Sequence, residues 1–92
     1  MRVSVRYMAQ LRTAAGTAAE TVHVQAPCIT CDLVAHLAAR HGDALRRLLL
    51  AADGRPHPAV LVFVGDVQAA PGEPVLLKEG DVVTLLSPVA GG

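Results

Sequence analysis

The spacing of apolar residues near the N-terminus predicts two strands. Between residues 3 and 9, in VSVRYMA, apolar and polar side chains alternate, as in a strand with one face against a core. The alternation stops around Gly16 and resumes in ETVHVQ, residues 20–25. Pro27 then ends the second segment, because proline cannot donate a ladder hydrogen bond. We predict that these two segments form a β-hairpin.

The pattern next changes to a helical period. Apolar residues recur three and four positions apart, at Leu33, Val34, Leu37 and Ala38. This spacing places them on one face of a helix over about residues 31–41. Thr30 is a candidate cap for its first turn, and Gly42 is suited to end it. A second, shorter helical stretch, DALRRLLLAA, follows at residues 43–52.

The C-terminal half returns to short strands. AVLVFV (59–64) is a strand candidate, and Gly65-Asp66 predicts a tight turn into VQAA (67–70). After the turn-rich segment PGEPVLLKEGD, the alternation in VVTLLS (82–87) predicts the last strand. This order allows the first and last strands to lie side by side and parallel at the centre of a mixed sheet, with a right-handed crossover through the helix.

The predicted fold class is therefore α+β. It is a ubiquitin-like β-grasp, in which a mixed sheet of four to five strands packs on one main helix and a short second helix. A length of 92 residues suits one core. We expect a β-grasp domain over residues 1–87 and a flexible C-terminal diglycine tail over residues 88–92.

Composition and charge narrow the possible functions. With 52% hydrophobic and 17% charged residues, the chain is far from the composition of disordered proteins. Eight basic residues balance eight acidic ones, so the net charge attracts neither nucleic acid nor an anionic membrane. The N-terminus lacks the apolar run of a signal peptide, and AVLVFV is far too short to span a membrane. We expect a cytoplasmic protein with no nucleic-acid or membrane partner.

The last six residues, SPVAGG, carry one group with distinctive chemistry. Gly91 and Gly92 lack a Cβ, so they can enter a slot too narrow for other residues. The group delivered there is the α-carboxylate of Gly92, which is ionised at neutral pH and is a poor electrophile until it is activated. A last strand in mid-sheet would present this tail to a partner. The alternative is a frayed terminus without a function.

Three segments carry a resemblance to a known family: MAQLRTAAG, KEGDVV ahead of the last strand, and the terminal PVAGG. Over its whole length the chain resembles the ThiS/MoaD family of sulfur-carrier proteins. It is most similar to the small subunit of molybdopterin synthase. In this family an E1-like adenylyltransferase uses ATP to adenylate the terminal glycine. A sulfurtransferase or other sulfur donor then forms a thiocarboxylate, which the carrier delivers to an acceptor enzyme such as the molybdopterin synthase large subunit.

The resemblance implies a site built around the tail. Gly92 would carry the adenylate and then the thiocarboxylate. The residues that would thread it into partner active sites are Gly91, Ala90, Val89 and Pro88. Docking would use the solvent side of the sheet near the tail, through Met8, Leu86 and Val67, with a polar contact from Arg12. The carrier would hold no stable cofactor and would not be catalytic alone. Ser87 stands where the family usually has a proline.

Other functions remain open at this point. One is a ubiquitin-like modifier joined through Gly92 to lysines of other proteins, and another is a plain interaction module with an inert tail. For a carrier, the length and the second helical stretch favour molybdopterin synthesis. Thiamine, cysteine, thiolated tRNA and other metabolites are alternative sulfur acceptors.

Cys28 and Cys31 form the motif CITC at the entrance of the predicted helix. A redox role there would need a different βαβ context, and a structural zinc would need two further ligands. The four histidines are scattered without catalytic spacing. The basic patch of Arg40, Arg46 and Arg47 is typical of a solvated helix face, since the chain is nearly devoid of aromatic residues that could stack on bases.

Overall fold

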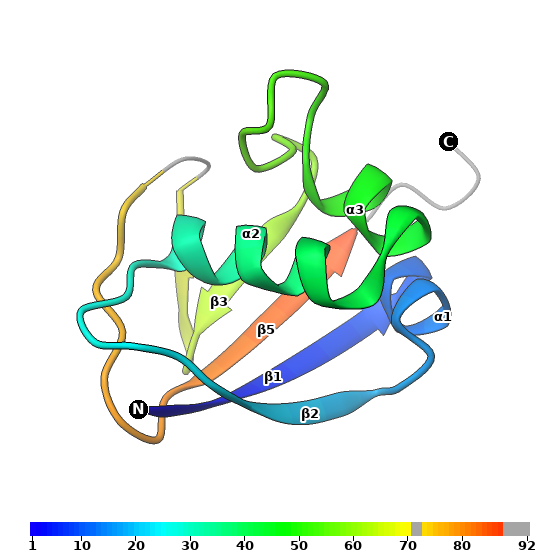
Figure 1. Ribbon diagram of the computed structural model, residues 1–92. Coiled ribbons are helices and arrows are strands. Elements are labelled where there is room, and N and C mark those ends of the chain that lie inside the picture. Colours follow the sequence, from blue (N-terminus) through cyan, green and yellow to red (C-terminus); the bar gives the residue numbers. More distant parts are fainter. Residues whose placement is uncertain (71–72, 88–92) are drawn as a thin grey trace.

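The computed structural model describes residues 1–70 and 73–87 (Figure 1). Its elements, in chain order, are β1 (Arg2–Ala9), α1 (Gln10–Ala15), β2 (Ala19–His23), α2 (Thr30–His41), α3 (Asp43–Leu49), β3 (Leu61–Val64), β4 (Val67–Ala69) and β5 (Val82–Ser87).

Five strands of the described chain form one mixed sheet in the order β2-β1-β5-β3-β4. β1 pairs with β5 in parallel, and the other neighbouring pairs are antiparallel. Figure 1 shows α2 lying across one face of this sheet. The predicted β-grasp, with parallel first and last strands at the centre, is confirmed.

The core lies between the sheet and α2, where the predicted alternation places it. Val3, Val5 and Tyr7 of β1 are buried, as are Val83 and Leu85 of β5. The four α2 residues predicted at helical spacing are also buried. Complete burial of one such aliphatic side chain contributes about 1.5–3 kcal/mol. This shared burial fixes which face of the sheet α2 covers.

The structure contains one helix that was not predicted, α1, and α3 ends at Leu49, three residues before the predicted stretch ends. Ala9 has a φ of 54° and turns the chain out of β1 into a six-residue helix, which buries Leu11. Gly16 closes this helix in the left-handed conformation, with its N–H donating to the carbonyl of Arg12 at 3.0 Å. The prediction had only a break in the alternation here, between the two strands of the hairpin. No helix in the described ranges is long and apolar enough to cross a membrane.

Thr30 does not cap α2, so that expectation is wrong. The N-cap is Ile29, which makes no side-chain cap hydrogen bond. The buried Thr30 hydroxyl instead donates to the carbonyl of Glu73 at 3.1 Å and accepts from the N–H of Val75 at 3.3 Å. The Thr30 N–H also donates to the carbonyl of Val75 at 2.9 Å. Thr30 therefore ties the start of α2 to the segment that leads into β5.

Candidate functional site

The strand that leads into the tail is held on both of its edges. β5 lies between β1 and β3, and its last residue, Ser87, is paired with Ala9 and is buried. Pro88, Val89, Ala90, Gly91 and Gly92 lie outside the described residues, so their predicted roles stay predictions. The structure shows the anchor of the tail, which is a central strand.

Met8 and Leu86 lie next to each other on the open face of the sheet, as expected. They are register partners in the parallel β1–β5 pair, and register partners point to the same face. Their neighbours in sequence, Tyr7 and Leu85, point into the core. Met8 is 44% exposed, and Leu86 is half-buried. Together they put apolar surface beside the point where the tail begins.

Two residues of β3 extend this surface, and sequence reasoning missed both. Leu61 pairs with Leu86, and Phe63 pairs with Thr84, so they share the open face. Both are half-buried. AVLVFV is apolar on both of its faces. Its sequence therefore does not alternate, and it does not indicate which residues point outward. We call Met8, Leu61, Phe63 and Leu86 the outer-face patch.

Val67 does not belong to this face, so the expectation that it joins Met8 and Leu86 there is wrong. It is the register partner of Val64, which pairs in turn with the buried Val83. Val67 therefore points to the helix side of the sheet. It is 71% exposed because β4 is an edge strand.

Arg12 is an exposed residue of α1, which packs next to the end of β5. Figure 1 shows α1 and α3 at the end of the sheet where the β5 arrow points. Arg12 is therefore placed near the start of the tail, as its predicted polar contact requires. The contact itself stays a prediction.

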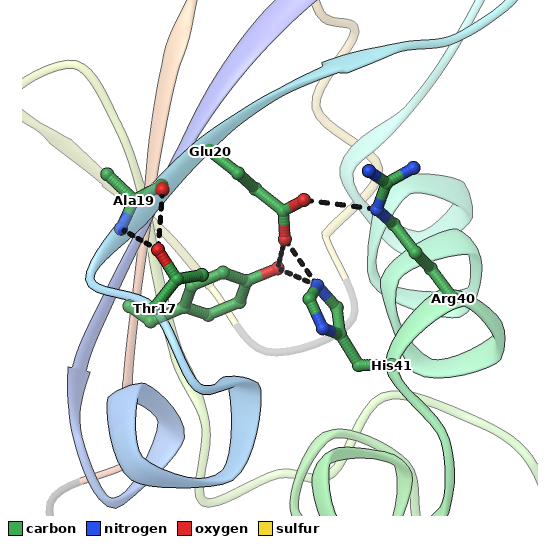
Figure 2. A network of polar contacts seen from close by, with 6 residues as sticks. Thr17, Ala19, Glu20, Arg40 and His41 are labelled. Carbon is green, nitrogen blue, oxygen red and sulfur yellow. Dashed lines mark hydrogen bonds and ion pairs between the residues drawn. The ribbon is translucent and has the colours of Figure 1, made fainter.

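A polar network joins β2 to the end of α2 (Figure 2). The Tyr7 hydroxyl donates to Glu20 Oε2 at 2.7 Å and lies 3.3 Å from His41 Nε2. His41 Nε2 also contacts Glu20 Oε2, and Arg40 Nε lies 3.1 Å from Glu20 Oε1. This network could not be predicted from the sequence, because its members lie far apart in the chain.

The network shifts the ionisation of two of its groups. Burial disfavours the charged form of Glu20, but the hydrogen bonds from Tyr7 and His41 and the charge of Arg40 outweigh it. The pKa of Glu20 is therefore below its usual value. Burial, together with the Glu20 carboxylate, raises the pKa of Tyr7. The network thus holds a carboxylate and a neutral phenol, and it serves to fix β1, β2 and α2 relative to one another.

The two cysteines differ in their surroundings. Cys28 is buried in the core, and this burial, with the nearby Asp32 charge, raises the pKa of its thiol. Cys31 is half-buried in the first turn of α2. Within residues 1–70 and 73–87, no group of three or more His, Cys, Asp or Glu side chains is arranged to hold a metal ion.

The model of the ThiS family matches residues 5–92. The chain belongs to the ThiS family. The match begins within β1 and runs through the diglycine terminus, so it includes the whole site described above. The resemblance seen in the sequence is confirmed. A comparison with curated proteins gives no match.

Solved structures of similar fold come from archaea and bacteria. SAMP1 from Haloferax volcanii is 27% identical, with a TM-score of 0.85 and 100% of both chains covered. A putative molybdopterin converting factor, subunit 1, from Pyrococcus furiosus is 25% identical, with a TM-score of 0.76 over 97% of this chain and 99% of that one. A chain of the Amycolatopsis orientalis BexX/CysO complex is 27% identical, with a TM-score of 0.68 and coverage of 98% and 99%.

Proposed function

We propose that this ThiS-family protein is a sulfur carrier that works through the carboxylate of Gly92. An E1-like enzyme would join this carboxylate to the α-phosphate of ATP and release pyrophosphate. A sulfur nucleophile would then displace AMP and leave a thiocarboxylate, which donates its sulfur to an acceptor enzyme. Activation is required because a free carboxylate is a poor electrophile.

The observation that carries this proposal is the family match, which reaches Gly92. The fold supports it, because the tail follows a strand paired on both edges. A tail anchored in this way leaves from a fixed point. Less of its orientation then has to be fixed when a partner binds, which lowers the entropic cost of binding.

The outer-face patch supports a docking role for the sheet. Met8, Leu86 and Leu61 are paired across the three central strands, next to the end of β5. Phe63 lies on the same face, two residues further along β3. Apolar side chains that are partly exposed in the free carrier can be buried by a partner, which stabilises the complex. Partner enzymes would then bind the patch and receive the tail together.

For the sulfur acceptor we propose molybdopterin synthesis. The Pyrococcus furiosus structure is named as a putative molybdopterin converting factor, subunit 1, and the two chains cover each other almost completely. On this proposal the partners are an E1-like adenylyltransferase, a sulfur donor and the large subunit of a molybdopterin synthase. Thiamine, cysteine and other acceptors are the alternatives.

Mass spectrometry of the intact protein tests the carrier function. After incubation with ATP, the adenylating enzyme of the same organism and sulfide, we expect a mass gain equal to one oxygen replaced by sulfur. A variant lacking Gly92 should show no gain, while its thermal unfolding matches that of the wild type. An unchanged wild-type mass under these conditions contradicts the proposal.

A second candidate function is protein modification, which the similarity to SAMP1 favours. The neighbours include structures titled small archaeal modifier protein 1, and SAMP1 from Haloferax volcanii is covered over its full length. Modifier and carrier share the adenylation step, and they differ in the nucleophile that attacks the adenylate. Denaturing gels of cell extracts that show larger species carrying this protein, absent when Gly92 is deleted, would support the modifier.

A further inference from the structure

The charged side chains of this neutral protein are unevenly distributed along the sheet. The tail leaves where Ser87 of β5 pairs with Ala9 of β1. The end of α2 reaches the same place, since His41 contacts Tyr7, and α3 packs against α1 there. We call residues 6–20 and 40–49 the tail end (Figure 1). The opposite end of the sheet, the far end, consists of residues 1–4, 28–32, 64–67 and 73–82.

The tail end is basic. It contains two acids, Glu20 and Asp43, and five arginines: Arg6, Arg12, Arg40, Arg46 and Arg47. Arg40 pairs with Glu20 at 3.1 Å, and Arg46 pairs with Asp43 at 3.1 Å. The other three arginines are exposed and have no ion-pair partner in the part of the chain that the structure describes. Five positive and two negative side chains give this end a net charge of +3.

The far end is acidic. Its five acids are Asp32, Asp66, Glu73, Glu79 and Asp81, and its two cations are Arg2 and Lys78. Arg2 and Glu79 form an ion pair at 3.4 Å. Two positive and five negative side chains give −3, and the Met1 ammonium group brings the charge of this end to −2. The remaining charged side chains are Asp53 and Arg55, which lie 3.9 Å apart in the loop after α3 and cancel each other. The net charge is zero, but the excess positive and the excess negative side chains lie at opposite ends, so the protein has a dipole directed along the sheet.

One of the unpaired arginines, Arg6, shares a face with the apolar surface already described. Arg6 and Met8 are two residues apart on β1, so both point to the open face of the sheet. Arg12 lies on α1 and Arg47 on α3, at the end from which the tail leaves. An apolar centre with a charged rim is the usual anatomy of a protein interface. Guanidinium groups on that rim match carboxylates, which they can bind in a bidentate manner.

We infer that the tail end is an electrostatically steered docking surface, and that its partner carries carboxylates around the cleft that receives the tail. This inference rests on the proposed function, and it specifies the charge that the adenylating enzyme presents. The electrostatic field of the enzyme's carboxylates orients the dipolar carrier so that its tail end approaches the enzyme first. Complementary charge of this kind raises the association rate and makes the rate depend on salt.

The test compares two triple variants that change the net charge equally. The first removes the unpaired arginines of the tail end: Arg6→Gln, Arg12→Gln and Arg47→Gln. The control removes three cations elsewhere: Arg2→Gln, Arg55→Gln and Lys78→Gln. All six side chains are exposed, so both variants should fold, which circular dichroism checks. The probe is the purified adenylating enzyme of the same organism, with association rate and kcat/KM for carrier adenylation measured from low to high NaCl.

We expect the tail-end variant to associate about tenfold more slowly than wild type at low salt, with a flatter salt dependence. The control should stay within about twofold of wild type. A tail-end variant with the wild-type salt dependence, or an equal loss in the control, overturns the inference while leaving the carrier function intact. Failure of wild-type adenylation at saturating carrier overturns the proposed function, and this inference with it.

Discussion

The hydroxyl of Tyr7 donates a hydrogen bond of 2.7 Å to Glu20, from the middle of the sheet to its edge strand. Tyr7 is 1% exposed, and the Glu20 side chain is 14% exposed. This contact joins the hydrophobic core to a carboxylate whose charged form the fold stabilises, and the stability of the protein therefore depends on the ionisation of Glu20.

Acid should destabilise the protein through Glu20. Its pKa is lower in the folded than in the unfolded state, so its contribution is complete above the unfolded pKa of about 4.3 and is lost as the pH falls through the folded pKa. Glu20→Gln should lower the free energy of unfolding by about 1–3 kcal/mol at neutral pH. The difference from wild type should shrink below about pH 4 in urea titrations. A difference that stays constant down to the lowest pH contradicts the assignment, and Asp66→Asn, at an exposed turn residue, serves as control.

Polar substitution at Met8 should weaken partner binding without loss of stability. Met8→Gln places an amide in the outer-face patch, where it would have to be desolvated on docking, at a cost of about 1–3 kcal/mol. This corresponds to roughly tenfold weaker binding of the adenylating enzyme or more. Val67→Gln is the matched control, because Val67 is exposed on the opposite side of the sheet. Calorimetric titration measures the affinity of both variants for the adenylating enzyme. An equal loss of affinity in the two variants would contradict a specific role of the outer-face patch.

Thr30→Val should destabilise the protein through the segment before β5. The variant keeps the shape of the side chain and removes the hydroxyl that joins Glu73 and Val75 to α2. The Glu73 carbonyl and the Val75 N–H each lose one partner but still bond to each other at 3.1 Å, so the loss should cost about 0.5–1.5 kcal/mol in thermal or urea unfolding. Thr17→Val removes a hydroxyl that bonds locally at an exposed turn, and it should change stability by less than about 0.5 kcal/mol. An equally mild effect at Thr30 would contradict the assigned role.

The two thiols should react at different rates. Cys28 is 5% exposed, and its pKa is raised by burial, so little thiolate forms and reagents reach it slowly. Cys31 is half-buried and should be the first to be labelled by an aromatic disulfide reagent. In Cys31→Ser, labelling should require unfolding, so its rate should rise steeply with urea. Fast labelling of native Cys31→Ser would show that Cys28 is accessible.

Much of the fold could be predicted because its signals are local. The alternation in β1 and β5 and the helical spacing of α2 each appear within a dozen residues. The order of these elements then leaves few topologies, since parallel strands need a right-handed crossover. The glycines that end the chain are equally visible, because their chemistry needs no tertiary context.

The candidate site could be predicted only in part. Met8 and Leu86 lie in alternating strands whose buried face is clear, so their outward direction follows from the sequence. Leu61, Phe63 and Val67 lie in or beside a run without alternation, and their faces depend on the register of β3 with β5 and β4. Arg12 and Arg47 are far apart in sequence, and the packing of α1 against α3 places them at the same end of the sheet.

The sequence by itself determined the period of each main element, the order of those elements and the presence of two glycines at residues 91 and 92. These are properties of neighbouring residues, which covalent geometry and side-chain spacing decide. The tertiary structure alone decided which side chains share a face, which hydroxyl ties which segment, and how a neutral set of charges becomes a dipole. Those outcomes depend on pairing between distant strands and helices, and burial of the whole core selects that pairing.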